Sequence, residues 1–242
     1  MIQETITYTC RRCGSPDIVK NGTTKCGSQQ YQCHACGAYQ TLEPKNSSAP
    51  YPKEVSLKTY QERASLRGLE RILGVARQTV SQWTRTILRT LPRLIDTLPP
   101  AQPGDVLELD EVWSFVLKKG QKRWLWIALC RRTRQVVAFT IGDRSEKTCR
   151  RLWNKLPEAY KHCQAYSDFW AAYQTVWPAD QHQAVGKETG ETAHIERWNN
   201  TLRQRLARYV RKTLSFSKSN LYHWIVTAWF IIEYNLSLSL TK

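Results

Sequence analysis

The hydrophobic and polar positions change their pattern twice along the chain. Within residues 53–97 apolar side chains recur at intervals of three and four, which predicts helices. From residue 105 onward, runs of apolar and β-favouring side chains come first and helical patterns follow. The expected elements of this last part are strands at 106–117, 123–130, 135–142 and 163–167 and helices at 145–155, near 192–212 and at about 216–236. Strands that precede helices in this way predict an α/β domain with a mixed sheet.

Two polar, proline-marked stretches separate the parts of the chain. One covers residues 46–52, and the other covers residues 98–104 and holds three prolines and a glycine. Such composition is typical of linkers. We therefore expect three domains, at residues 1–46, 53–97 and 105–242.

The first domain contains the pattern Tyr-x-Cys-x-x-Cys-Gly twice, at 8–14 and at 31–37. Two Cys-x-x-Cys pairs with nineteen residues between them match the spacing of a four-cysteine structural zinc site. The glycine after each pair can adopt a positive φ, which lets both thiolates face one ion. We predict a small zinc ribbon in which Cys10, Cys13, Cys33 and Cys36 bind one structural Zn²⁺. A redox dithiol or plain buried cysteines are the alternatives.

Residues 65–90 predict two amphipathic helices joined by a glycine turn. The first apolar stripe ends at Gly74, and the two stripes are formed by Leu66, Leu69, Ile72 and Leu73 and by Val80, Trp83, Ile87 and Leu88. This arrangement is typical of a helix-turn-helix DNA-binding domain. Polar side chains on the second helix suit base edges and phosphates, and the expected DNA-binding residues are Arg77, Gln78, Thr79, Ser81, Gln82 and Arg85. An ordinary helical hairpin with a solvated polar face is the alternative.

The net charge of the chain points to a polyanionic partner. Lys and Arg outnumber Asp and Glu by 36 to 20, which gives a formal charge of +16. Nucleic acids and anionic membrane surfaces both attract such a chain. The longest apolar stretch, 224–232, is far shorter than the ~20 residues that a membrane span needs, and no signal peptide is recognised at the start. We therefore expect a cytoplasmic protein, without a membrane partner.

Acidic residues lie in one predicted strand and directly after another. Asp110 and Glu111 interrupt an apolar, strand-like run. Burial of an unpaired carboxylate is costly, so acidic residues at this place suggest a function. Alternation places the two side chains on opposite faces of the strand, and periodicity alone does not say which of them is the metal ligand. Asp168 follows the short strand at 163–167. The alternatives are a solvated strand edge for the first pair, and a helix N-cap formed by Ser167 or Asp168.

A third acidic position, Glu196, lies on the predicted long helix. It borders an apolar stripe made of Ile195, Trp198, Leu202, Leu206 and Tyr209. Glu196 can therefore point inward beside the sheet, with Asn200 and Arg203 near the same face. The residues of this helix that we expect to bind DNA are Arg197, Asn200, Arg205, Arg208, Arg211 and Lys212. A solvated amphipathic helix is the alternative.

The acidic motifs carry a family resemblance. In order they are Leu-Asp-Glu-x-Trp at 109–113, Ser-Asp-x-Trp at 167–170 and Ile-Glu-Arg-x-Asn-Asn-x-Leu at 195–202, followed by Arg-Lys-Thr-Leu-Ser-Phe-Ser-Lys-Ser at 211–219. Together they resemble the transposases of the insertion-sequence-one family, of the InsA–InsB type. Residues 105–242 resemble the InsB part, and the cysteine and helix-turn-helix segments resemble the InsA part.

This resemblance implies a ribonuclease-H-like catalytic domain with a triad of Asp110, Asp168 and Glu196, the DDE arrangement. The resemblance favours Asp110 over Glu111 as the first acid of the triad. It also matches Arg203 with the basic residue that follows the glutamate in DDE enzymes. The 27 residues between Asp168 and Glu196 are a few more than expected, so we expect the extra length in the loop at 180–192.

The chemistry of three carboxylates fits the implied activity. They can hold two Mg²⁺ or Mn²⁺ ions ~3.5–4 Å apart, which cut and join phosphodiester bonds. We expect double-stranded DNA, both transposon ends and target, as the partner, a homodimer or higher oligomer, and association with a prokaryotic nucleoid. A zinc-dependent DNA-binding regulator and a ribonuclease-H-like nuclease or resolvase are the alternatives.

Overall fold

The computed structural model describes residues 7–42 and 53–239. The chain divides into two compact units, Met1–Tyr51 and Pro52–Lys242, each of which we describe by itself. The predicted linker at 46–52 lies outside the described residues. Residues 53–97 and 105–239, which we predicted as two domains, lie together in the second unit.

The described part of the first unit is a small antiparallel sheet. Its strands are β1 (Ile18–Thr23), β2 (Gln29–Cys33) and β3 (Tyr39–Gln40), in that order. Each Cys-x-x-Cys turn is closed by a hydrogen bond from the glycine N–H to the first cysteine's carbonyl, at Gly14 (2.7 Å) and Gly37 (2.8 Å). Both glycines have a positive φ, +73° and +69°, which other residues rarely adopt.

The second unit begins with three short helices, α1 (Lys53–Tyr60), α2 (Leu66–Leu73) and α3 (Arg77–Thr86). The side chain of Ser65 caps α2 by accepting a hydrogen bond from Gly68 N–H (3.0 Å). Gly74 ends α2 in the left-handed conformation that the turn requires, with φ of +66°. Helix α3 ends at Thr86, so Ile87 and Leu88, which we placed in its apolar stripe, lie in a 3₁₀ turn at Ile87–Arg89.

A five-stranded mixed sheet follows, in the order β6-β5-β4-β7-β8. The strands are β4 (Val106–Phe115), β5 (Lys122–Cys130), β6 (Val136–Gly142), β7 (Gln164–Ser167) and β8 (His182–Ala184). Pairings of β5 with β4 and β6 are antiparallel, while β4–β7 and β7–β8 are parallel. Strand β8 was not predicted, because its three residues lie within the segment that we expected to be a loop.

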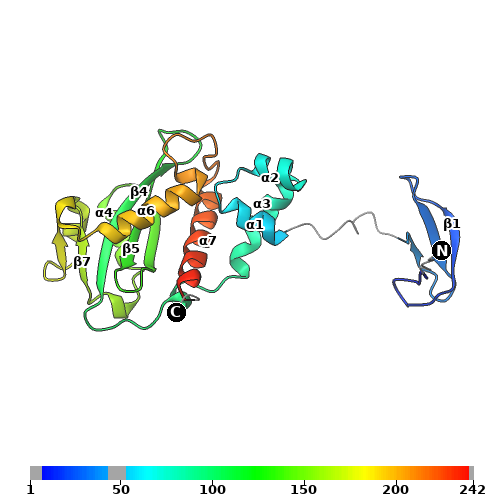
Figure 1. Cartoon of the computed structure of the whole chain (residues 1–242), viewed down its shortest axis with the longest axis horizontal. Coiled ribbons are helices and arrows are strands. Elements are labelled where there is room, and N and C mark those ends of the chain that lie inside the picture. The colour runs from blue at the N-terminus through cyan, green and yellow to red at the C-terminus, as the bar shows by residue number, and fades with distance from the viewer. Residues whose placement is uncertain (1–6, 43–52, 240–242) are drawn as a thin grey trace, which may run out of the picture. The chain divides into compact units, whose positions relative to one another are not determined.

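Helices cover both faces of this sheet (Figure 1). One hydrophobic cluster joins the odd-numbered positions of β4, such as Leu107 and Leu109, to α4 (Glu146–Trp153) and α5 (Ala171–Val176). The other cluster joins Val112 to α6 (Ala193–Arg205) and α7 (Asn220–Ser239). The sheet is thus buried on both faces, and successive residues of β4 point into different layers.

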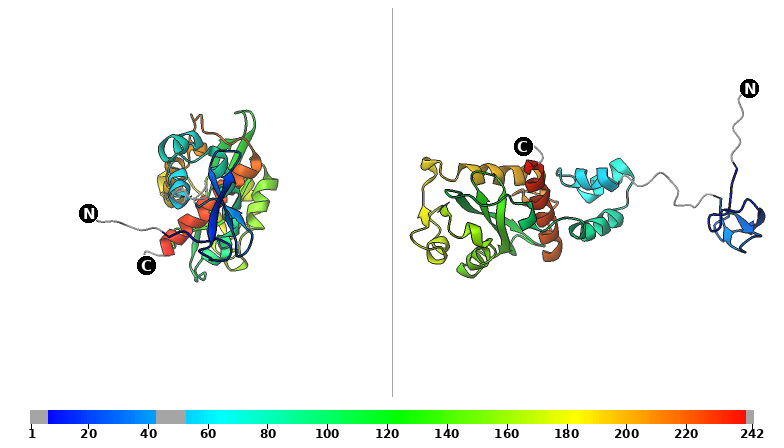
Figure 2. Two further views of the ribbon diagram at one scale, coloured as in Figure 1. Left: turned by 90° about the vertical axis from the view of Figure 1, so that its right-hand side faces the viewer. Right: turned by 90° about the horizontal axis from the view of Figure 1, so that it is seen from below.

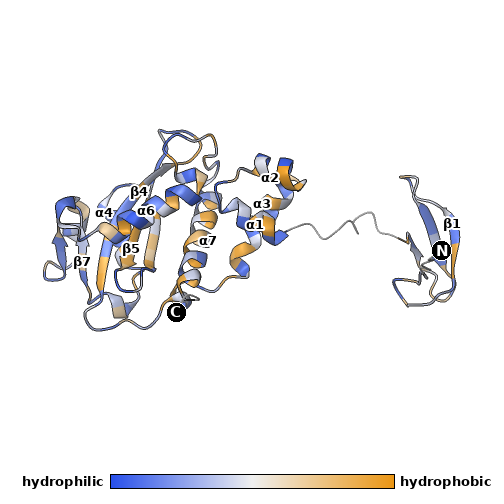
Figure 3. Cartoon of the chain, viewed as in Figure 1, coloured by the Kyte–Doolittle hydropathy of each residue, from blue (hydrophilic) through white to orange (hydrophobic). Residues whose placement is uncertain are grey.

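The same second cluster includes α2 and α3, the helices of the predicted helix-turn-helix. Leu69 and Val80 belong to it together with Val226 and Trp229 of α7, and all four are buried. Helix α7 accordingly lies between the sheet and the helices α1–α3 (Figures 1 and 2). Its many apolar positions, orange in Figure 3, explain why most of the stretch at 224–232 belongs to the core. Among the described residues, no helix has the length and apolarity to span a membrane.

The predicted long helix at 192–212 is shorter in the structure. Helix α6 ends at Arg205, and a separate 3₁₀ turn covers Ala207–Tyr209. The apolar stripe misled the prediction, since Leu206 and Tyr209 are buried even though the helix has ended. The other 3₁₀ turns are Leu94–Thr97, Glu158–Tyr160 and Lys187–Thr189.

Candidate active site and zinc centre

The four cysteines of the first unit come together at one point. Sγ of Cys10 lies 3.6 Å from Sγ of Cys36, and Sγ of Cys13 lies 3.6 Å from Sγ of Cys33. The four sulfur atoms all lie within 4.8 Å of one another. Zn–S bonds of ~2.3 Å in a tetrahedron place two sulfur atoms about 3.8 Å apart, so the cluster is compatible with a zinc site.

The register of two parallel strands brings Asp110 and Asp168 to the same level of the sheet. Strand β4 pairs with β7 so that Glu108 lies opposite Tyr166. Two residues farther along each strand, Asp110 lies level with Asp168, which comes just after the end of β7. Oδ1 of Asp168 accepts a hydrogen bond from Trp170 N–H (3.0 Å). The N-cap residue of α5 is Trp170, without a side-chain cap, so Asp168 is not the N-cap of that helix.

Helix α6 brings Glu196 to the face of β4 that carries Asp110. One turn after Glu196, Nδ2 of Asn199 donates a 2.6 Å hydrogen bond to Oδ2 of Asp110. Asn199 is 3% exposed, whereas Asn200, which we had selected, is exposed to solvent. Strand alternation alone did not say whether Asp110 or Glu111 faces α6. The hydrogen bond from Asn199 shows that Asp110 does.

The electrostatics of Asp110 reflect this crowding. Burial, together with the negative charges of Glu111, Asp168 and Glu196, raises the pKa of Asp110 to about 7. Backbone hydrogen bonding from Glu111 N–H opposes the shift. Burial raises this pKa most, and the neighbouring negative charges add to it, so a cation bound here would be stabilised.

The donor atoms of this site suit a hard divalent cation. Asp110, Asp168 and Glu196 supply only carboxylate oxygens, which Mg²⁺ prefers. Within residues 7–42 and 53–239, Oδ2 of Asp168 and Oε2 of Glu196 make no hydrogen bond, and Oδ1 of Asn199 is buried without a partner. Each of these three side chains therefore keeps one oxygen free of other protein atoms, as expected of cation ligands.

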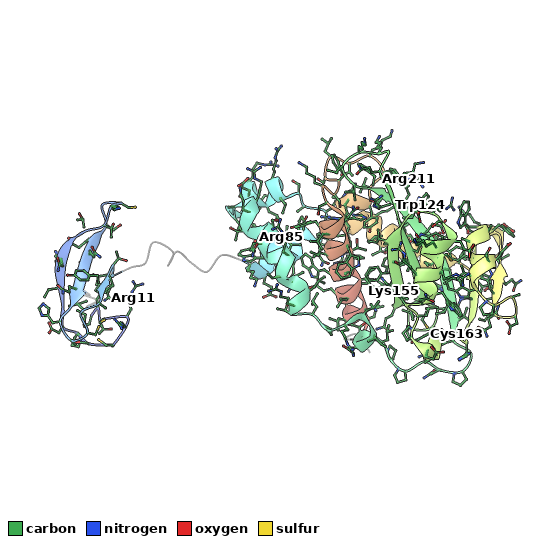
Figure 4. The ribbon with its side chains drawn as sticks, turned by 180° about the vertical axis from the view of Figure 1, so that it is seen from behind. Arg11, Arg85, Trp124, Lys155, Cys163 and Arg211 are labelled. Atoms are coloured by element: carbon green, nitrogen blue, oxygen red, sulfur yellow. The ribbon has the colours of Figure 1, made fainter. Side chains whose placement is uncertain are left out.

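Glu111 is used on the opposite face of β4. Its buried carboxylate forms an ion pair with Arg144 and accepts a hydrogen bond from Tyr173 O–H (2.9 Å). The Arg144 guanidinium lies over the rings of Trp170 (3.8 Å) and Trp124 (4.7 Å), the latter labelled in Figure 4. The contacts connect the strand of Asp110 with the residue two positions after Asp168.

Comparison with known proteins bears on the family of the chain. A family model described as IS1 transposase matches residues 106–235, which is more than half of the chain. The chain belongs to the IS1 transposase family. The residues that match the family model include all three carboxylates of the candidate site. This IS1-family chain was thus correctly placed by its sequence motifs.

Three curated relatives match about half of this IS1-family chain. The iso-IS1n protein InsB of Shigella dysenteriae is 42% identical over 126 residues, 52% of this chain and 93% of the relative. The IS1 protein InsB of Shigella flexneri is 41% identical over 112 residues, 46% and 82% of the two chains. An InsB protein of Escherichia coli K12, from IS1 4, is 40% identical over 122 residues, 49% and 71%.

The predicted DNA-contacting residues of the transposase differ in exposure. On α3, Arg77, Gln78, Gln82 and Arg85 are exposed, and Thr79 and Ser81 are half-buried. Arg77 also pairs with Glu70 (2.8 Å). Of the predicted DNA-binding residues beyond Glu196, those exposed to solvent are Arg197, Asn200, Arg211 and Lys212. Figure 4 labels Arg85 and Arg211.

Two arginines of the predicted DNA-binding set are engaged within the protein. Arg208 is only 7% exposed and donates hydrogen bonds to Ser217 Oγ (2.9 Å) and Tyr60 O–H (2.7 Å). A guanidinium held in this way has little surface left for a phosphate, so the structure does not favour the prediction that Arg208 contacts DNA. Arg205 is half-buried and pairs with Glu62 (2.6 Å). Both side chains connect the end of α6, or the segment that follows it, with the C-terminal end of α1.

Arg203 lies close to the acidic site. Burial and the charge of Arg211 lower the pKa of Arg203, while the charge of Asp110 opposes that shift. In the described part of the chain, its Nε atom is buried and has no hydrogen-bond partner. Arg203 therefore presents an uncommitted donor beside the carboxylates.

Three residues near the candidate site escaped the sequence reasoning. Asn199 was visible only as part of a motif, although it buries an amide on the apolar side of α6. Glu108 is 0% exposed and lies on the same face as Asp110. The partner of Glu111, Arg144, lies 33 residues away, and no local pattern connects the two.

Proposed function

We propose that this transposase binds the terminal inverted repeats of an insertion sequence and catalyses metal-dependent strand cleavage and strand transfer. Asp110, Asp168 and Glu196 are the proposed ligands of two Mg²⁺ ions in a ribonuclease-H-like catalytic domain. The observation that carries the proposal is that three carboxylates, on β4, just after β7 and on α6, lie close enough for the charges of Asp168 and Glu196 to add to burial and Glu111 in raising the pKa of Asp110. The mixed sheet of β4–β8 supports the proposed fold.

The protein's own residues have distinct tasks in this chemistry. Two bound Mg²⁺ ions supply activation of the attacking oxygen and charge stabilisation of the leaving oxygen. Asn199 holds Oδ2 of Asp110 in one orientation, so that the carboxylate does not have to reorganise. Arg203 offers its buried Nε to the anionic phosphate. The same residues serve cleavage by water and joining by a DNA 3′-hydroxyl.

Recognition of the ends is assigned to the smaller modules. We propose that α3 enters the major groove and that the cysteine cluster binds one structural Zn²⁺. The exposed cations Arg211 and Lys212 would contact flanking phosphates without sequence preference. Because two DNA ends must be brought together, a dimer or larger assembly is proposed as the active form.

Transposition in cells tests the catalytic assignment. We expect Asp168→Asn to abolish transposition, because the amide cannot replace a charged metal ligand. Asp180→Asn changes an exposed aspartate between β7 and β8 and should leave transposition unchanged. Normal transposition by the Asp168→Asn variant would exclude the assignment.

A DNA-binding assay tests the division between recognition and general attraction. Gln82→Ala, on the exposed face of α3, should weaken binding to end DNA while leaving random DNA unaffected. Arg211→Ala should weaken binding to both and reduce the salt dependence by about one phosphate contact. Equal losses on both DNAs for Gln82→Ala would argue against recognition by α3.

A further inference from the structure

A second buried carboxylate lies on the active-site face of β4. Glu108 precedes Asp110 by two residues, so both side chains point toward α6. Its carboxylate is 0% exposed and accepts hydrogen bonds from Arg131 Nε (2.9 Å), His194 N–H (3.0 Å) and Ile195 N–H (2.9 Å). Oε1 of Glu108 also lies 2.6 Å from Nδ1 of His194. A buried charge with so many partners is well satisfied.

These contacts make Glu108 the cap of the helix that carries Glu196. The N-terminal N–H groups of a helix lack partners within the helix and carry a partial positive charge. Thr192, at the N-cap position of α6, makes no capping hydrogen bond. Glu108 supplies the missing acceptor from the neighbouring strand, so the start of α6 is fixed relative to β4.

The partner of Glu108 extends this connection to the third element of the site. Besides Glu108, the guanidinium of Arg131 donates to the carbonyl of Glu191 (2.6 Å) and pairs with the Glu191 carboxylate (2.7 Å), just before α6. It also lies 5.1 Å from the centroid of the Tyr166 ring on β7, two residues before Asp168. A single side chain therefore contacts β4, β7 and the approach to α6.

We propose that Glu108 and Arg131 are positioning residues of the active site. They fix β4, β7 and α6 at the separation at which Asp110, Asp168 and Glu196 can share divalent cations. This inference rests on the proposed function and adds to it two residues that would not touch metal or DNA. Outer residues that orient metal ligands typically change metal affinity by roughly 10- to 100-fold when they are replaced.

The chain contains a matched control for this pair. Arg132, the next residue, forms an ion pair with Asp105, through Nε to Oδ1 (2.5 Å) and Nη2 to Oδ2 (2.8 Å). Asp105 is also buried, at 4% exposed. This second pair has the same chemistry and a similar place in the fold, but its described contacts do not reach β7 or α6.

Manganese binding to the full-length, zinc-loaded protein tests the proposal. Electron paramagnetic resonance of free Mn²⁺ gives the affinity, and thermal unfolding gives the stability of each variant. We expect Glu108→Gln and Arg131→Lys to weaken Mn²⁺ binding by roughly 10- to 100-fold. Asp105→Asn should lower the unfolding temperature without changing the affinity of the folded protein.

The outcomes separate the two levels of the account. Wild-type affinity in both Glu108→Gln and Arg131→Lys would overturn the positioning role while leaving the metal site intact. An equal loss of affinity in Asp105→Asn would also overturn it, because general loosening would then explain the effect. If Asp110→Asn binds as much Mn²⁺ as the wild type, the proposed function itself fails. Arg131→Lys keeps the charge and provides the answer should Glu108→Gln not fold.

Discussion

A buried histidine makes the second unit sensitive to acid. His223, on α7, is 1% exposed, and its Nδ1 and Nε2 atoms face Ser217 Oγ (2.8 Å) and Tyr209 O–H (3.4 Å). Burial and the charges of Arg208 and Arg123 lower the pKa of His223 to about 3. The folded protein therefore holds His223 neutral at a pH where the unfolded chain would bind a proton.

The sign and size of the effect follow from linkage. Between the folded pKa of about 3 and the unfolded value near 6.5, the unfolded state binds more protons, so stability falls as the pH decreases. From about pH 7.5 to about pH 4.5, this single group removes roughly 2.6 kcal/mol of unfolding free energy. No further loss is expected below about pH 3, where the folded form also becomes protonated.

Urea unfolding at a series of pH values measures this contribution. His223→Gln removes the titration, so the difference in unfolding free energy between wild type and variant should shrink by roughly 2.6 kcal/mol between about pH 7.5 and about pH 4.5. His162→Gln, at an exposed position, is the control and should run parallel to the wild type. A difference between wild type and His223→Gln that stays constant with pH would refute the reasoning.

Two further predictions concern the cysteine cluster and the ion pair of β4. Cys33→Ser should reduce bound zinc from one ion per chain to none and unfold the first unit, whereas Cys26→Ser should keep the metal; mass spectrometry and circular dichroism measure both. Glu111→Gln should cost about 1–3 kcal/mol of stability in urea unfolding, because Arg144 keeps a charge without its partner. The exposed carboxylate of Glu146 gives the control, since Glu146→Gln should cost at most about 1 kcal/mol.

Much of the fold follows from short-range patterns. The glycine after each cysteine pair and Gly74 after α2 act within a few residues, so spacing alone indicated these turns. The strands β4, β5 and β6 are long enough for their apolar runs to be recognised. The three-residue strand β8 could not be recognised, because its pairing with β7 depends on contacts across the chain.

The limits of sequence reasoning appear most clearly at the end of α6. The apolar stripe continues through Leu206 and Tyr209 with helical spacing, but the backbone leaves the helix after Arg205. Arg208 consequently turns inward to Tyr60, 148 positions away along the chain. Such a contact has no local signal, and composition alone favoured a DNA-binding role for this arginine.

The candidate site shows the same division. Strand alternation correctly placed Asp110 and Glu111 on opposite faces, and the structure adds which helix each face meets. The roles of Asn199, Glu108 and Arg131 depend on how α6 approaches β4, which is a tertiary property. Sequence motifs thus indicated the carboxylates, while the residues that position them became visible only in the folded chain.

The most direct test of the central claim is single-turnover cleavage and joining of a labelled duplex that carries the element's end, in Mg²⁺. We predict that the wild type and Asp180→Asn cleave and join the end. Asp110→Asn should bind the end but lose about 100-fold or more of both activities, since even outer residues of metal sites cost roughly 10- to 100-fold. Cleavage by Asp110→Asn at the wild-type rate, or tight end binding without cleavage by any of the proteins, would contradict the account.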